Sequence, residues 1–318
     1  MKKLLSMFVV ASMAFAVGAH AETKRIALVL PGPITDGTFN SAANKGIEAA
    51  KKKYDIEVAV RENTDFAQME EVLRSYADDD YDMVIAHGFQ FGEAVLAVHN
   101  DYPETFFVVN TAQVSAAPNV ASFDNRWGDA GYIAGAVAAL YSKSGKIGTI
   151  GAIAVPVIEQ YNLGFERGAK HMKPETKVLS AYVGSFTDVA RGAEITTSLI
   201  EQGADVVTST GNENVMGTIQ AAQKAKVKAI GSAFDSYQMA PDTIITTALI
   251  NMDVNIDLAI GRFIEGKLKP ESYVLGLNDG GIGLAPLREF ENQISAEDKA
   301  RIDALIADIA VGRIKDLP

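Results

Sequence analysis

Cysteine is absent from all 318 residues of the sequence. Its absence excludes disulfide bridges, a thiol nucleophile, thiolate ligands for a metal, and the N-terminal cysteine that carries the lipid of a lipoprotein. Histidine is scarce, and its four copies include no zinc-binding spacing such as HExxH. The nucleophile-elbow pattern GxSxG and the phosphate-binding P-loop are also missing. We therefore expect a protein that is not an enzyme and that uses no metal and no other cofactor.

Positive charge is also in short supply. The chain has 29 basic and 40 acidic residues and a formal net charge of −11 at pH 7. Without Lys2 and Lys3, 27 basic residues face 40 acidic ones and the net charge is −13. Such a balance repels nucleic acid and anionic membrane surfaces, so we expect neither as a partner.

No hydrophobic run reaches the roughly 20 residues that a membrane-spanning helix needs. The N-terminal run, residues 4–17, counts 14 and follows Lys2 and Lys3. Residues 19–21 then read Ala-His-Ala, the small-x-small pattern that signal peptidase cleaves. We predict that residues 1–21 are a cleaved signal peptide and that the mature protein lies in the periplasm.

What the chain does contain is an internal repeat. Ile26 in KRIALVL corresponds to Ile147 in GKIGTIG, 121 residues later, and Val108 in TFFVVN corresponds to Ile230 in VKAIGSA, 122 residues later. Two further pairs keep the same offsets, Val58 with Leu179 and Val84 with Val206. Four apolar runs in one order at one offset indicate a duplicated unit. We expect two similar lobes with a cleft between them.

Each half alternates short apolar runs with stretches of helical periodicity, which is typical of βαβ units. In the first half the expected strands are residues 25–30, 56–61, 83–86, 106–110 and 120–123. Parallel strands with right-handed crossovers bring their carboxyl ends and βα loops to one edge of the sheet, where ligands bind. The predicted fold class is α/β, with two doubly wound parallel-sheet lobes.

The C-terminal part of the chain exceeds the repeat. We expect a strand at residues 244–250, a helix at 253–265, an irregular glycine-rich stretch at 275–284 and a last helix at 296–310. Short runs at Phe123, Ile245 and Leu277 fit three strands of a hinge on which the lobes close. Lobe 1 is predicted to comprise residues 22–125 and 248–278, and lobe 2 residues 126–247 and 279–318.

Candidate ligand-binding residues begin in the first βα loop, PGPITDGTFN, with Asp36, Phe39 and Asn40. At an offset of 122 residues, Tyr161 and Asn162 repeat the aromatic-asparagine pair. Rings offer stacking faces to a planar ligand or a sugar, and amides read its hydrogen-bonding edges. Packing of either ring against its own lobe is the alternative, and the sequence does not decide between the two.

Further candidates follow later strands. Gly88 and Gly211 lie after the third strand of each half, where glycine lets the backbone approach a ligand closely, and Phe89 and Asn212 follow them directly. A histidine at a strand end, such as His87, is as consistent with a backbone hydrogen bond as with ligand contact.

The second half adds Phe186 in GSFTD and Asp235 in SAFDS. A carboxylate in such a loop suits either vicinal hydroxyls of a ligand or the start of a helix, and for Asp188 the helix cap is the better interpretation. The only tryptophan, Trp127, is consistent with hinge packing or with ligand contact.

In order, the motifs DGTFN, HGFQF, YIAGAVAALYSKSGKIG, GFERGAK, GSFTD, QGADVV and IGSAFDSYQ resemble the basic membrane protein family of substrate-binding proteins for ABC importers, which includes purine nucleoside receptors. The resemblance runs from about Lys24 to past Leu284. It implies the type I periplasmic-binding fold, with two lobes joined by a three-strand hinge. It also implies a small-molecule ligand, an ABC permease and ATPase in the inner membrane as partners, and a monomer.

The resemblance assigns roles to some residues and leaves others open. Asp36, Phe39 and Asn40 match the residues that contact the purine in nucleoside-binding members, and Asp235 matches the aspartate that holds the ribose hydroxyls. Asn110 stands where such members have a carboxylate that reads the base. Thr208 stands where they have a second stacking phenylalanine, and a position near Ile250 where they have a ribose-contacting lysine.

Because of these departures, Tyr161 or Phe186 is the expected replacement ring, and the ligand is expected to be a purine nucleoside, a purine base or a related polar heterocycle without phosphate. A sugar-type solute receptor and a ligand-sensing partner of a receptor kinase are the alternatives. A nucleoside hydrolase is disfavoured, because such enzymes need an aspartate cluster in the first loop, where Asp36 stands alone.

Overall fold

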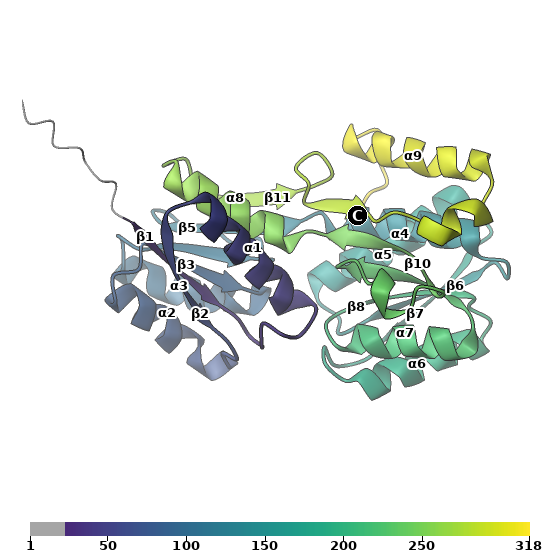
Figure 1. The fold of residues 1–318 in the computed structure, drawn as a ribbon, viewed down its shortest axis with the longest axis horizontal. Helices are drawn as coiled ribbons and strands as arrows, with labels where there is room; N and C mark the ends of the chain where they lie inside the picture. Colours follow the sequence, from purple (N-terminus) through teal and green to yellow (C-terminus); the bar gives the residue numbers. More distant parts are fainter. Residues whose placement is uncertain (1–22) are drawn as a thin grey trace, which may run out of the picture.

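The computed structural model describes residues 23–318, so the predicted signal peptide lies outside the described residues. This part of the chain forms two lobes, each built on a six-stranded sheet with helices on both faces (Figure 1). Between residues 23 and 318 no helix is both long enough and apolar enough to cross a membrane.

Lobe 1 holds a parallel sheet in the order β11-β5-β4-β3-β1-β2. Its strands are β1 (Lys24–Val29), β2 (Ile56–Arg61), β3 (Met83–His87), β4 (Phe106–Asn110), β5 (Val120–Asn125) and β11 (Ser272–Leu275). One face is covered by α1 (Phe39–Lys53) and α8 (Met252–Ile264), and the other by α2 (Met69–Asp78) and α3 (Gly92–Val98).

Lobe 2 repeats this arrangement in the order β12-β10-β9-β8-β6-β7, with β12 antiparallel to β10 and the other pairs parallel. Its strands are β6 (Lys146–Gly151), β7 (Lys177–Tyr182), β8 (Val206–Thr210), β9 (Lys228–Ala233), β10 (Ile244–Ile250) and β12 (Ile282–Leu284). Helices α4 (Trp127–Tyr141), α5 (Pro156–Met172) and α9 (Ala296–Ala310) cover one face, and α6 (Val189–Glu201) and α7 (Asn214–Ala225) the other.

The sheets are buried on both faces, which explains why their strands read as continuous apolar runs. In β1, Ile26 and Leu28 pack toward α1 and α8, while the alternating residues Ala27 and Val29 pack toward α2 and α3. Corresponding strands hold the same places in the two sheets, as the repeat predicts. The predicted fold class, α/β with two doubly wound parallel-sheet lobes, is confirmed.

The chain crosses between the lobes three times, from β5 to α4, from β10 to α8, and from β11 to β12. The residues expected at the hinge lie at these places, with Phe123 in β5, Ile245 in β10 and Leu277 between β11 and β12. Residues 248–250, assigned to lobe 1 from the sequence, form the end of β10 and pair with β12 in the sheet of lobe 2.

Helix α4 follows β5 of lobe 1 but packs against α5 of lobe 2. Helix α8 follows β10 of lobe 2 but packs against α1 of lobe 1. Glycine allows these contacts to be close: a Cβ on Gly135 of α4 would lie 1.9 Å from the carbonyl oxygen of Phe165. Gly46 in α1 and Gly168 in α5 occupy the equivalent places, 122 residues apart. Every residue of α4 from Trp127 to Leu140 is buried, which accounts for its largely apolar sequence, in which Asp129 is the one charged residue.

We predict that Gly135→Ala lowers the free energy of unfolding by about 1–3 kcal/mol, because the added methyl group meets backbone that cannot move aside without separating α4 from α5. Urea unfolding of the mature protein measures this change. Gly92→Ala in α3 is the matched control, since its Cβ would lie 3.8 Å from the nearest side-chain atom, and we expect a change within about 0.5 kcal/mol. Equal losses in the two variants would contradict the packing argument.

Candidate functional site

A cavity of about 600 Å³ lies between the lobes, at the carboxyl ends of the strands of both sheets. Lobe 1 contributes residues 31–33, 38–40, 63–66, Met69, Phe89, Gln90 and Thr111. Lobe 2 contributes Val157, Ile158, Phe186, Thr187, residues 210–213 and residues 232–234, and the helices that begin after the crossings contribute Trp127 and Met252. Of the residues predicted to bind ligand, this lining includes Phe39, Asn40, Phe89, Phe186, Gly211 and Asn212.

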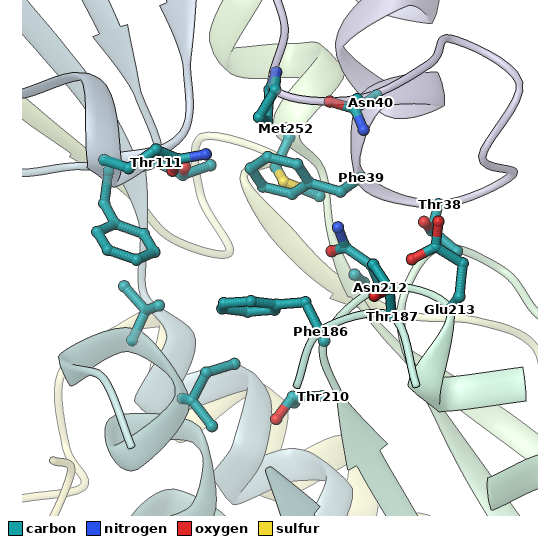
Figure 2. Close-up of a pocket in the computed structure, with 18 of the residues that line it drawn as sticks. Thr38, Phe39, Asn40, Thr111, Phe186, Thr187, Thr210, Asn212, Glu213 and Met252 are labelled. Atoms are coloured by element: carbon teal, nitrogen blue, oxygen red, sulfur yellow. The ribbon is translucent and has the colours of Figure 1, made fainter. Parts of the chain in front are cut away.

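Aromatic rings enter the cavity from both lobes. Figure 2 shows Phe39, at the start of α1, and Phe186, in the loop between β7 and α6, reaching into the same space. The loop of Phe186 is tied to the next one, because its carbonyl oxygen accepts hydrogen bonds from the backbone N–H groups of Asn212 (3.3 Å) and Asn214 (3.2 Å). The rings are therefore carried by ordered loops of opposite lobes, a geometry that suits a flat ligand between them.

The polar lining is dominated by oxygen atoms without partners. Six buried side-chain oxygens of the lining have no hydrogen-bond partner within residues 23–318: Thr38 Oγ1, Asn40 Oδ1, Thr64 Oγ1, Thr111 Oγ1, Thr210 Oγ1 and Glu213 Oε2. Thr38, Asn40 and Glu213 lie along one side of the cavity and Thr111 on the opposite side (Figure 2). Because buried polar atoms are nearly always hydrogen-bonded, these oxygens mark positions where a ligand can be recognised.

The charge of the lining has one sign. Among the described residues that line the cavity, Asp65 and Glu213 are acidic and none is lysine, arginine or histidine. Phosphate and carboxylate groups are normally held by such cations or by helix N-termini. Helices α1, α4 and α8 begin at the lining, but backbone N–H groups at the start of α1 are already bonded to the Asp36 carboxylate. The charged side chains of the cavity therefore favour a neutral or cationic ligand.

Asp36 lies just outside the lining and organises the loop that presents Phe39. Its carboxylate accepts hydrogen bonds from the backbone N–H groups of Thr38, Asn40 and Ser41 at 2.9–3.0 Å and from the side chains of Asn40 and Ser41 at 2.8 Å. Burial alone would raise the pKa of Asp36, but these backbone hydrogen bonds outweigh it and lower the pKa below its usual value. The carboxylate thus satisfies the backbone N–H groups of Asn40 and Ser41 at the start of α1.

Asn110 and Gly88 also lie outside the lining, behind Phe39. His87 stacks on the Phe39 ring with centroids 3.9 Å apart, and its Nε2 lies 3.0 Å from the Phe39 carbonyl oxygen. Asn110 contacts the other ring nitrogen of His87 at 3.0 Å. Gly88 turns the chain after β3 with a φ of +124°, a conformation suited to glycine.

Tyr161 and Thr208 lie in the core of lobe 2, where the Tyr161 hydroxyl is 3.2 Å from Thr208 Oγ1. The repeat itself holds, since Asn162 is buried as Asn40 is. The two halves differ in where the helix starts: α1 begins at Phe39, whereas α5 begins at Pro156, five residues before the position equivalent to Phe39. Val157 and Ile158 of this extra turn line the cavity in the place predicted for Tyr161.

Asp235 lies outside the lining, next to Phe234, which is part of it. Its carboxylate forms an ion pair with Arg288 within lobe 2, and the side chain is partly exposed. Asp188, by contrast, caps α6 as predicted, by accepting a hydrogen bond of 2.8 Å from the backbone N–H of Arg191.

Much of the lining was not predicted from the sequence, including Thr38, Thr111, Thr187, Thr210, Glu213 and Met252. A signal for two of them was present, because Thr210 ends β8 and Thr111 directly follows β4, the positions at which ligands are expected. Thr111 also has a φ of +68°, which is uncommon for a β-branched residue and marks a strained backbone at the cavity.

Burial gives His87 a measurable effect on stability. Removal from water lowers the pKa of His87 to about 4 from its ordinary 6.5, against smaller raising effects of the Phe39 carbonyl and the Asp36 carboxylate. The unfolded chain therefore binds a proton between pH 6.5 and 4 that the folded protein excludes. We predict that the neutral His87 side chain contributes about 3 kcal/mol to the free energy of unfolding above pH 6.5. This contribution is lost as the pH falls to 4.

The measurement is urea unfolding between pH 4 and 7 for the natural protein and for His87→Gln. Glutamine offers one donor and one acceptor but does not titrate in this range. The difference in the free energy of unfolding between the two proteins should shrink by about 3 kcal/mol from pH 7 to pH 4. Parallel pH profiles would show that His87 is not held neutral.

The sequence matches a known protein family and several proteins within it. The profile of the family described as "ABC transporter substrate-binding protein PnrA-like" matches residues 23–315. Basic membrane protein A of Borreliella afzelii is 24% identical, over 92% of this chain and 91% of its own. A purine-binding protein of Brucella abortus is 27% identical, over 96% of this chain and 89% of its own.

Among solved structures, an ABC transporter solute-binding protein from Aeropyrum pernix K1 has a TM-score of 0.83 at 23% identity, and the match covers 92% of each chain. This likeness confirms the predicted type I periplasmic-binding fold. The family match confirms the resemblance that the sequence motifs carry and establishes the protein class, a solute receptor of ABC transport. The chain belongs to the Bmp family of PnrA-like ABC transporter substrate-binding proteins.

Proposed function

We propose that this protein binds a planar, non-anionic heterocycle of the purine class between its lobes and delivers it, in the periplasm, to the permease and ATPase of an ABC importer. One observation carries the proposal: Phe39 and Phe186 enter one cavity from opposite lobes, and the lining around them is polar but has no basic side chain. Closure of the lobes would bring both rings onto the faces of such a ligand.

The size and chemistry of the cavity support this ligand class. A volume of about 600 Å³ lies within the range of roughly 300–1,000 Å³ found for small-molecule sites. The amides of Asn40 and Asn212 each offer a donor and an acceptor, which suits the alternating nitrogens of a heterocycle. Of the unpartnered oxygens of the lining, the amide and carboxylate oxygens accept hydrogen bonds, and the threonine hydroxyls both donate and accept. A ligand with N–H donors and ring-nitrogen acceptors, such as an aminopurine, satisfies both kinds.

Within this class the residues favour a free base over a nucleoside. The two ribose-contacting positions of the nucleoside receptors are Asp235, which is paired with Arg288, and a position near Ile250, an apolar residue at the end of β10. Neither Asp235 nor Ile250 lines the cavity. The name of the Brucella abortus relative, a purine-binding protein, also supports a purine base as the ligand.

A thermal-shift panel of adenine, guanine, adenosine, AMP and galactose on the mature protein tests the proposal. A compound at 100 times its dissociation constant adds about 2.7 kcal/mol of stability. We expect adenine or guanine to raise the melting temperature most, adenosine less, and AMP and galactose not at all. A response to galactose alone would support a sugar receptor and would contradict the proposed ligand class.

We further predict that Phe186→Ala weakens adenine binding by about 10- to 100-fold, because stacking and burial on an aromatic ring together contribute roughly 1.5–3 kcal/mol. Isothermal titration calorimetry gives the dissociation constants. Tyr182→Ala is the matched control, since this ring lies four residues earlier, is 40% exposed and does not line the cavity. Unchanged affinity in Phe186→Ala would remove Phe186 from the site.

A further inference from the structure

A line of buried polar side chains connects Phe39 in the cavity to the three crossings between the lobes. It runs from His87 at the end of β3 through Asn110 at the end of β4 and Asn255 in α8 to Asn125 at the end of β5. We call these four residues the Asn255 relay. None of them lines the cavity, and the accessible fraction of each is at most 1%.

At the cavity end, the hydrogen bonds fix the direction of the relay. The Phe39 carbonyl can only accept, so His87 Nε2, 3.0 Å away, carries the ring proton. His87 Nδ1 is then an acceptor, and it faces Asn110 Nδ2 at 3.0 Å. With its amide so oriented, Asn110 presents Oδ1 to Asn255, whose Nδ2 donates to it at 2.9 Å.

At the hinge end, the relay touches each crossing. Asn255 Nδ2 also donates to Asn125 Oδ1 at 2.8 Å, and Asn125 Nδ2 donates to the carbonyl oxygen of Gly281 at 2.7 Å. The same carbonyl accepts the backbone N–H of Asn251 at 2.8 Å. Asn125 precedes the first crossing, Asn251 lies in the second, and Gly281 lies in the third.

Each buried amide of the relay needs its hydrogen-bond partners, because an unpaired polar group in the interior lowers the stability of the protein. Removing one partner leaves the others unpaired, at roughly 1–3 kcal/mol for each unsatisfied group. A bend at the crossings that moves Asn125 or Gly281 relative to α8 must therefore be followed by Asn255, Asn110 and His87 or else break these bonds. His87 holds Phe39 by both ring stacking and the carbonyl hydrogen bond.

We propose that Asn255 is a positioning residue that couples the placement of the Phe39 ring to the arrangement of the lobes. A ligand that stacks on Phe39 thereby biases the hinge, and by reciprocity the hinge sets the affinity for the ligand. The identity of the ligand rests on the proposed function, whereas the coupling between ring and hinge does not.

The test compares Asn255→Leu and His87→Phe with the natural protein. Leucine has nearly the shape of asparagine without its donors and acceptor, and phenylalanine keeps a ring against Phe39 without either hydrogen bond. Asn119→Leu is the matched control. Asn119 is buried in lobe 1 and bonds a second histidine, His99, at 3.0 Å, but it lies before β5, at the opposite edge of the sheet from the cavity.

The first readout needs no ligand. Because the natural chain has no cysteine, Glu71→Cys in α2 and Thr197→Cys in α6 place one spin label on each lobe, at exposed positions. Double electron–electron resonance then gives the distribution of distances between the lobes. We expect Asn255→Leu and His87→Phe to shift or broaden this distribution, and Asn119→Leu to leave it as in the natural protein. If His87→Phe leaves the distribution unchanged, the link from hinge to ring is overturned, whatever Asn255→Leu does.

The second readout is the affinity for adenine, measured by calorimetry. We expect about a tenfold loss in Asn255→Leu and His87→Phe, within the range usual for coupled sites, and no loss in Asn119→Leu. Equal affinities in all four proteins would overturn the proposal. If adenine does not bind to the natural protein, guanine takes its place in this measurement. If neither base binds, the proposed function fails and the distance distributions alone decide on the relay.

Discussion

The position of the cavity depends on one constraint of parallel sheets: strands that run in the same direction place all their βα loops at the same edge. In this chain the constraint acts twice, because the duplicated halves build sheets with the same strand order. The loop edges of the two sheets face each other, so Phe39 and Phe186 enter one space although 147 residues separate them. The order and direction of the strands therefore determine where the cavity lies, and the side chains determine what it can bind.

The two lobes are linked because each contains a helix that follows a strand of the other lobe. The helix after the fifth strand of each sheet packs on the other lobe, and glycines such as Gly46 and Gly168 allow a close approach of backbones there. These contacts fasten α4 to lobe 2 and α8 to lobe 1, so we expect bending at the three crossings. The buried amide of Asn125 directly precedes the first crossing, and its partner Asn255 lies in the first turn of α8, just after the second crossing. The proposed coupling residues are therefore neighbours of the helix contacts in the chain.

The hydrophobic periodicity and the internal repeat were sufficient to predict the fold. Buried strands and helices have apolar residues in a regular pattern, and this pattern can be recognised within each segment of the sequence. Most predicted strands and helices agree with the structure within one or two residues, for example residues 244–250 with β10 and 296–310 with α9. For the site, strand-end position predicted Phe39, Asn40, Phe186 and Asn212 as ligand-binding residues. All four lie in the lining of the cavity, and their contact with a ligand stays a prediction.

Other residues could not be placed from the sequence, because their surroundings come from distant segments or from local helix geometry. Five additional residues at the start of α5 move Tyr161 into the core. Pro156, at the first position of α5, is a sequence signal for this earlier start, but the repeat offset alone does not show it. Asp235 meets Arg288, which is 53 residues away in the chain, and Asn110 meets Asn255 across 145 residues. Such pairings depend on tertiary packing and are invisible to spacing arguments.

The central claim is that a flat, non-anionic heterocycle lies between rings from opposite lobes. The most direct measurement is a crystal structure of the mature protein grown with adenine. We predict a purine ring stacked between Phe39 and Phe186, with its edge hydrogen-bonded to Asn40 or Asn212. Density for adenine elsewhere on the molecule, or closed lobes in which Phe39 and Phe186 contact each other directly, would contradict the account.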